Sequence, residues 1–269
     1  MALNSTVTHL LNNGRQIPVV GFGVYELPAG RKTTDLVKRA LQAGYRHIDT
    51  AAMYGNEAET GQGILESGIP RESIFVTTKL DDPDHGYQPT LDAFHISLKK
   101  LGLSYVDLFL IHSPHGGTKL RLESWKAMEE LYHQGLIKSI GVSNYGVHHL
   151  QELMDFCTVK PAVNQIELHP WFSQPEIVEL CHRHDIVIEA YSALARAEKA
   201  SDPVLQAIAK KYGKSWAQIL IRWSLQHGYV PLAKTATPDR IPQNLDVFDF
   251  TIVDEDMRVL DGLNENLPL

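Results

Sequence analysis

The chain has 269 residues, a net charge of −7, and 43% hydrophobic and 21% charged residues. This composition is typical of a globular protein with a large core, and the negative charge argues against a broadly basic nucleic-acid-binding surface. The two cysteines, Cys157 and Cys181, lack a CxxC spacing, so we expect free thiols. We find neither a signal peptide nor the roughly 18 consecutive apolar residues that a membrane span needs, so we expect a cytoplasmic protein.

The chain opens with a predicted β-hairpin over Thr8–Val20, around the Asn-Gly turn at Asn13-Gly14. After it, short apolar runs predict eight strands over Val19–Tyr25, His47–Ala51, Ile74–Leu80, Val106–His112, Ser139–Asn144, Ala162–Leu168, Ile186–Leu194 and Tyr229–Lys234. Helical spacing between and after them predicts helices over Thr33–Ala43, Glu57–Ser67, Pro89–Leu101, Leu120–Gln134, His148–Phe156, Gln174–His184, Ser201–Tyr212, Ser215–His227, Pro238–Leu245 and Asp254–Leu263.

This alternation of strands and helices predicts the fold. Helical crossovers favour parallel strands, and eight such units close into a (β/α)8 TIM barrel, here with an N-terminal hairpin and extra C-terminal helices. An open doubly wound sheet is the structural alternative, but Gly21-Phe22-Gly23 lacks the third glycine of a dinucleotide-binding GxGxxG motif. No linker or low-complexity segment interrupts the pattern, so we expect residues 1–269 to form a single barrel domain.

Polar side chains recur at the ends of these apolar strands. Catalytic groups of such barrels come from the carboxyl ends of several strands, which meet at one face. The strand ends contribute Asp49, Lys79, His112, Asn144, Gln165, Tyr191 and Lys234, and Tyr54 follows Asp49 in the next loop. We therefore expect one cleft that collects these groups.

Four of these residues have a coherent chemistry. Lys79 ends a very apolar strand, where it would be costly to bury unpaired, and Asp49 is a suitable counter-ion. A nearby ammonium is expected to lower the pKa of the Tyr54 phenol, which makes Tyr54 a proton donor to a developing alkoxide. His112 can orient a carbonyl oxygen. Taken singly, each has a plainer interpretation: a structural ion pair, a packed aromatic ring, or a loop histidine.

Three motifs then resemble the aldo-keto reductase superfamily, and specifically its short fungal or bacterial NADPH-dependent reductases. They are GYRHIDTAAMYGNE from Gly44, the stretch Leu120–Tyr145 with its GVSNY end, and LAKTATPDRIPQN over Leu232–Asn244. The resemblance covers nearly the whole chain. It implies that Asp49, Tyr54, Lys79 and His112 form the catalytic tetrad, with Tyr54 as general acid.

A nicotinamide cofactor is expected because no side chain can supply a hydride. Hydroxyl and cationic side chains near Pro238, at the start of a helix, suit a phosphate group. The resemblance implies that the NADPH 2′-phosphate and adenine lie at this end and that the opposite end holds the carboxamide and nicotinamide ring. The candidate cofactor-binding residues are Ser143, Asn144, Gln165, Tyr191, Ser192, Leu194, Lys234, Thr235, Arg240 and Asn244.

Some positions depart from the common family pattern. The cations at the phosphate end favour NADPH over NADH, but Gln243 replaces a frequent glutamate before Asn244 that often contacts the adenosine, so the strictness of this preference stays open. Ser113 and Asp81 stand where tryptophans are frequent, so we expect a wider and more polar substrate pocket, with Tyr25 and Ser113 as candidate pocket residues. Trp171 is either a wall residue or a packed core residue.

The resulting hypothesis is an NADP-dependent aldo-keto reductase, of the alcohol dehydrogenase (NADP+) type, that reduces small aldehydes and ketones. The resemblance implies a monomer. We expect no metal, since the histidines form no HExxH or HxxEH pattern. The alternatives are a catalytically silent NADPH-sensing regulatory subunit on the same fold and a metal-assisted barrel hydrolase.

Overall fold

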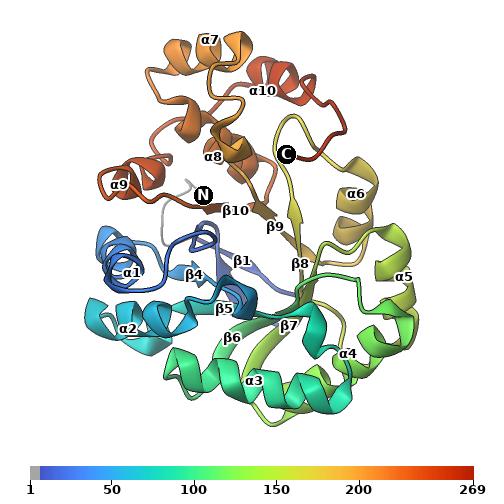
Figure 1. Ribbon diagram of the computed structural model, residues 1–269. Helices are drawn as coiled ribbons and strands as arrows, with labels where there is room; N and C mark the ends of the chain where they lie inside the picture. Colours follow the sequence, from blue (N-terminus) through green and yellow to red (C-terminus); the bar gives the residue numbers. More distant parts are fainter. Residues whose placement is uncertain (1–6) are drawn as a thin grey trace.

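Eight parallel strands close into a barrel in the order β10-β3-β4-β5-β6-β7-β8-β9, and helices surround it (Figure 1). This computed structural model describes residues 7–269; residues 1–6, part of the segment in which we expect no signal peptide, lie outside the described range. The strands of the barrel are β3 (Gly21–Gly23), β4 (His47–Asp49), β5 (Phe75–Leu80), β6 (Val106–Ile111), β7 (Ile137–Ser143), β8 (Val163–Glu167), β9 (Val187–Tyr191) and β10 (Val230–Ala233). The predicted (β/α)8 barrel is confirmed.

The helices follow the predicted order. They are α1 (Arg31–Ala43), α2 (Glu57–Ser67), α3 (Tyr87–Leu101), α4 (Gly117–His133), α5 (Val147–Phe156), α6 (Pro175–Arg183), α7 (Pro203–Tyr212), α8 (Trp216–Gln226), α9 (Arg240–Leu245) and α10 (Asp254–Asp261). Short 3-10 turns occur at η1 (Ala52–Tyr54), η2 (Arg71–Ser73), η3 (Asp82–Asp84) and η4 (Ala195–Ala197). Within the described residues, no helix has the length and apolar character needed to cross a bilayer.

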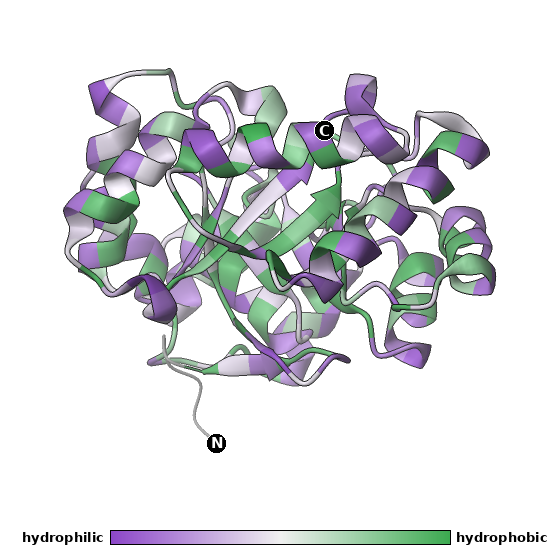
Figure 2. Ribbon diagram, turned by 90° about the horizontal axis from the view of Figure 1, so that it is seen from below, coloured by the Kyte–Doolittle hydropathy of each residue, from purple (hydrophilic) through white to green (hydrophobic). Residues whose placement is uncertain are grey.

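The N-terminal hairpin closes the amino-terminal end of the barrel. Strands β1 (Thr8–Leu10) and β2 (Gln16–Pro18) pair in antiparallel register, as predicted. The flanking Leu11 and the β2 residue Ile17 pack in one cluster with Phe75 and Val230, the first residues of β5 and β10. In Figure 2 the strands at the centre are largely apolar, while the surrounding helices alternate between apolar and polar residues. Because one end is plugged, side chains at the carboxyl ends of the strands are the ones that face an open cavity.

Several strands end earlier than predicted, and the differences shape this open end. β4 stops at Asp49, and the chain turns through η1, so that Tyr54 leaves the barrel wall. β9 stops at Tyr191 rather than Leu194, because Ser192 has a left-handed backbone (φ 48°) that cannot continue a strand. His112 and Asn144 likewise lie one residue beyond their strands. Candidate residues are therefore carried by short loops above the barrel.

Candidate active site

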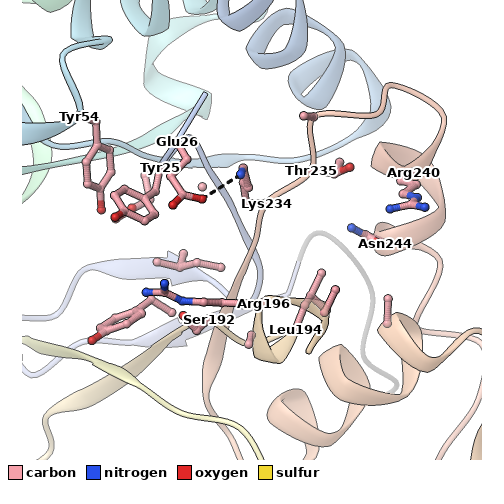
Figure 3. A pocket seen from close by; sticks show the side chains of 18 of the residues that line it. Tyr25, Glu26, Tyr54, Ser192, Leu194, Arg196, Lys234, Thr235, Arg240 and Asn244 are labelled. Atoms are coloured by element: carbon pink, nitrogen blue, oxygen red, sulfur yellow. Dashed lines mark hydrogen bonds and ion pairs between the residues drawn. The ribbon is translucent and has the colours of Figure 1, made fainter. Parts of the chain in front are cut away.

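One cavity of about 800 Å³ opens at the carboxyl ends of the barrel strands. Its walls come from the loops after β3, β4, β9 and β10 and from the ends of β6, β7 and β8 (Figure 3). Among the predicted site residues, those that line it are Tyr25, Asp49, Tyr54, His112, Ser143, Asn144, Gln165, Tyr191, Ser192, Leu194, Lys234, Thr235, Arg240 and Asn244. The barrel thus brings residues from most of the chain to one place.

Lys79 lies beneath the floor of this cavity and is fully buried. Its ammonium donates hydrogen bonds to Asp49 Oδ1 at 2.7 Å, to the Thr50 carbonyl at 3.0 Å and to the Tyr54 hydroxyl at 3.1 Å. Burial alone would lower the pKa of Lys79, but the negative partner Asp49 and the Tyr54 oxygen raise it above its ordinary value. All three donors of a charged ammonium are therefore satisfied, and one of them holds the Tyr54 oxygen in place.

The Tyr54 hydroxyl has a pKa raised above its ordinary value, so the expected lowering is wrong. Burial of the phenol is the largest cause, and it outweighs the opposite effect of the Lys79 ammonium. The Tyr54 ring also packs 5.0 Å from the Tyr25 ring, between centroids, on the cavity side. Tyr54 is consequently a protonated phenol at neutral pH, which is the form that a proton donor needs.

His112 also contacts the Tyr54 ring. The two rings meet edge to face with their centroids 5.7 Å apart. Burial, assisted by the nearby Lys79 charge, lowers the pKa of His112 to about 3, so the imidazole is neutral at physiological pH. A neutral histidine beside the Tyr54 hydroxyl adds no second positive charge to the floor of the cavity.

A second wall of polar side chains follows the ends of β7, β8 and β9. Asn144 has a left-handed backbone (φ 61°), and its amide donates to the His112 carbonyl at 3.0 Å and to Ser143 Oγ at 3.2 Å. The Tyr191 hydroxyl donates to Asn144 Oδ1 at 2.8 Å, and Ser143 Oγ donates to the Gln165 carbonyl at 2.8 Å. These bonds fix the four residues in one rigid surface.

The far end of the cavity carries cationic and hydroxyl groups. Lys234 and Thr235 follow β10, while Arg240 and Asn244 come from α9, and all four line the cavity. In Figure 3, Thr235, Arg240 and Asn244 lie near one another, and Lys234 points toward Glu26. The Lys234 ammonium pairs with the Glu26 carboxylate at 3.5 Å; the Lys234 side chain is partly exposed and that of Glu26 is exposed. Cations, a hydroxyl and an amide in this arrangement suit an anionic phosphate group.

The cavity also contains residues that sequence reasoning did not single out. Glu26 and Met53 come from the loops after β3 and β4, Arg196 lies after β9, and Trp216 begins α8. Arg196 belongs to a run with positive φ at Ala195, Arg196 and Ala197 (46°, 46° and 64°). Because alanine and arginine rarely adopt this conformation, the sequence carries no glycine signal for this turn.

Two candidate pocket residues lie elsewhere. Ser113 is not among the lining residues, because its hydroxyl donates to Asp82 Oδ1 at 2.5 Å in the neighbouring loop. Trp171 is buried in the main hydrophobic core, so packing is the correct one of its two interpretations. Over residues 7–269, no group of three or more histidine, cysteine, aspartate or glutamate side chains is arranged to hold a metal ion.

Comparisons with known proteins agree on one family. The sequence profile described as "Aldo/keto reductase family" matches residues 20–265. The chain is 48% identical over 259 residues to the 9,11-endoperoxide prostaglandin H2 reductase of Trypanosoma cruzi, covering 95% of this chain and 91% of that protein. It is 46% identical over 256 residues to the glyoxal reductase of Bacillus subtilis, covering 95% and 92%. A crystal structure of an aldo-keto reductase from Bombyx mori in complex with NADP superposes with a TM-score of 0.91 at 37% identity, covering 99% of this chain and 95% of that one.

Proposed function

The chain belongs to the aldo/keto reductase family of oxidoreductases, and from this premise we propose that it is an NADPH-dependent reductase of aldehydes and ketones. The observation that carries the proposal is the Tyr54 hydroxyl, which faces the cavity while the buried Lys79–Asp49 pair holds it from below. A protonated phenol at such a position can donate a proton to a carbonyl oxygen as negative charge develops there.

We assign each floor residue a role. Tyr54 is the general acid, and its oxygen takes up the negative charge when its proton is transferred. Lys79 stabilises that charge, since its ammonium already donates to the Tyr54 oxygen at 3.1 Å, and Asp49 neutralises Lys79 at 2.7 Å. His112 is neutral and edge-on to Tyr54, so it can donate a hydrogen bond that orients the substrate carbonyl.

The chain's own residues also fit a phosphorylated nicotinamide cofactor, which would supply the hydride. Lys234, Thr235, Arg240 and Asn244 would hold the 2′-phosphate and adenosine at the cationic end of the cavity. Ser143, Asn144 and Gln165 would hold the carboxamide, Tyr191 would stack on the ring, and Ser192 and Leu194 would contact the connecting part. The solved NADP complex of a relative supports this choice of cofactor.

The names of the relatives guide the substrate panel. One relative is a glyoxal reductase and another reduces a prostaglandin endoperoxide, so we propose small dicarbonyls and apolar aldehydes as the first substrates. The apolar surfaces of Tyr25 and Met53 beside Tyr54 support the second class. We further propose a monomeric, single-domain cytoplasmic enzyme of the alcohol dehydrogenase (NADP+) type, in line with its two free cysteines.

The test is NADPH oxidation, followed by absorbance, with this panel and with NADH in parallel. Turnover that prefers NADPH is the expected result. In Tyr54→Phe, NADPH binding should persist and turnover should fall by about 100-fold or more, because only the proton donor is lost. Tyr45→Phe is the matched control, since Tyr45 is buried in the core outside the cavity. Tight NADPH binding by the wild type without turnover on any carbonyl would instead favour the sensing subunit.

A further inference from the structure

Glu189 is a buried acid without a role in the proton transfer proposed above. It lies on β9, is fully buried, and pairs in parallel register with Gln165 of β8. Burying a carboxyl group costs free energy unless the group is hydrogen-bonded, so Glu189 needs a hydrogen-bonding partner inside the barrel. That partner is the Gln165 side chain.

The Gln165 amide is held by two carboxyl groups. Its Nε2 lies 2.9 Å from Asp49 Oδ2 and 2.7 Å from Glu189 Oε2. Because Asp49 is the carboxylate partner of Lys79 and can only accept, the amide must present its NH2 group to that side. Both hydrogens of Nε2 are then used. Gln165 also lines the cavity, and among the described residues its Oε1 takes part in no hydrogen bond.

The neighbouring polar groups likewise have their donors engaged within the protein. Asn144 uses its amide hydrogens on His112 and Ser143, and Ser143 uses its hydroxyl hydrogen on the Gln165 carbonyl. This part of the cavity wall therefore offers oxygen acceptors, with Gln165 Oε1 the unengaged one, and not spare donors. A ligand group that matches it is an NH2 group.

The protonation of Glu189 keeps this arrangement from accumulating negative charge. Burial, and next the negative charge of Asp49, raise the pKa of Glu189 to about 8, against smaller lowering effects of Gln165 and Lys79. His47 faces the other oxygen, with Nε2 3.4 Å from Oε1, and burial lowers the pKa of His47 to about 3. Near pH 7, Glu189 is thus an uncharged acid that accepts from Gln165 without adding a second buried carboxylate.

We propose that Glu189 is a positioning residue: together with Asp49, it fixes the Gln165 amide so that the carbonyl oxygen faces the cavity and accepts a hydrogen bond from the carboxamide NH2 of nicotinamide. This inference rests on the proposed function, because it assumes that the nicotinamide end of the cofactor lies at Gln165. Glu189 lies behind the cavity wall and would not contact the cofactor itself. Its hydrogen bond with Gln165 Nε2 would determine that the cofactor contacts Gln165 Oε1.

The test compares two ligands that differ only by the nicotinamide. NADPH and 2′-phospho-ADP-ribose, which lacks that ring, are titrated calorimetrically into the wild type, Glu189→Leu and Glu189→Gln. Glu189→Leu removes the acceptor and frees the Gln165 amide to turn, so NADPH should bind about 3- to 10-fold more weakly, the equivalent of one hydrogen bond. Binding of 2′-phospho-ADP-ribose should stay within about 2-fold. Glu189→Gln retains an acceptor oxygen and should bind both ligands like the wild type.

Other outcomes would overturn the inference. Equal weakening of both ligands in Glu189→Leu would mean that Glu189 only supports the fold, and unchanged NADPH binding would mean that Gln165 needs no partner. Glu189→Thr, whose side chain is too short to reach Gln165, replaces the leucine variant if that one does not fold. A wild type that binds NADPH no tighter than 2′-phospho-ADP-ribose would overturn the proposed function at this wall as well, and that failure is visible before any variant is made.

Discussion

Removing both partners of the buried Lys79–Asp49 pair should cost less stability than the sum of the two single changes that break it. Both side chains are essentially excluded from water, and the ion pair is 2.7 Å long. Lys79→Met leaves Asp49 as a buried carboxylate with Gln165 as its remaining hydrogen-bond donor, and it strips the Thr50 carbonyl and the Tyr54 hydroxyl of their ammonium partner. Loss of one partner of a buried pair costs about 3–5 kcal/mol.

Asp49→Asn should cost a similar amount, because it leaves a buried ammonium without its counter-ion. The double variant Asp49→Asn/Lys79→Met contains no buried charge here, and the introduced amide still offers an oxygen to Gln165. We expect it to lose about 2–3 kcal/mol less than the sum of the two single changes, since the desolvation penalty disappears with the second charge.

Urea denaturation provides the measurement. The buried residues Trp125, Trp171 and Trp223 report the loss of the core through their fluorescence. The ion pair between Arg31 and Glu66 is the matched control, because its separation is also 2.7 Å but its side chains are largely or partly exposed. The corresponding double-mutant cycle at Arg31 and Glu66 should show a much smaller coupling free energy. Additive losses at Lys79 and Asp49 would refute the view that an uncompensated buried charge dominates the single variants.

Three further changes test the charges around the cavity. Arg240→Ala should raise the apparent KM for NADPH about 10-fold and that for NADH little, because the variant loses one charged hydrogen bond to the 2′-phosphate. Equal effects on the two KM values in steady-state kinetics would mean that the phosphate does not bind at Arg240. Glu26→Gln should tighten calorimetric NADPH binding about 2- to 5-fold by freeing Lys234. Glu123→Gln makes the same change in net charge at a partly exposed position away from the cavity lining, and it should leave binding unchanged. Folding raises the pKa of Glu189 from 4.5 to about 8. Between pH 4.5 and pH 8 the folded protein therefore binds a proton at Glu189 that the unfolded chain does not. Stability is therefore lost as pH rises from 5 to 8, by up to about 1.4 kcal/mol per pH unit, and Glu189→Gln should flatten that slope in urea titrations.

Sequence patterns were sufficient for the features that depend on local spacing. The bounds of α2, Glu57–Ser67, are as predicted, because an acidic first turn and Gly68 mark its ends. The hairpin, the eight parallel strands and the convergence of Asp49 and Lys79 follow from the same periodicity. Strand ends were less predictable: β9 stops before Ser192 because a left-handed residue ends it, and serine carries no signal for that backbone.

Properties that depend on three-dimensional surroundings could not be predicted from the sequence. The predicted direction of the Tyr54 pKa shift was wrong. The spacing of the sequence indicates a neighbouring ammonium but not how deeply the phenol is buried, and burial is the larger cause of the shift. Glu26 was missed because its contact with Lys234 joins residues 208 positions apart. Glu189 was missed because nothing local in the sequence shows that it is buried inside the barrel beside Gln165.

The charge balance inside the barrel explains how these features serve one chemistry. Lys79 and Asp49 cancel each other, Glu189 holds its proton near pH 7, and His112 is neutral. The buried floor therefore has no net charge before the reaction, and Tyr54, whose pKa is raised by burial, keeps its proton. When Tyr54 gives up that proton, its oxygen becomes negative 3.1 Å from the Lys79 ammonium. The attraction between these two charges is weak in water but strong in the low-dielectric interior. The Lys79 charge therefore has its largest effect during the proton transfer. The raised pKa of Tyr54 and its role as an acid are therefore compatible: Tyr54 keeps its proton until a substrate oxygen receives it, and the Lys79 ammonium stabilises the phenolate that this transfer leaves.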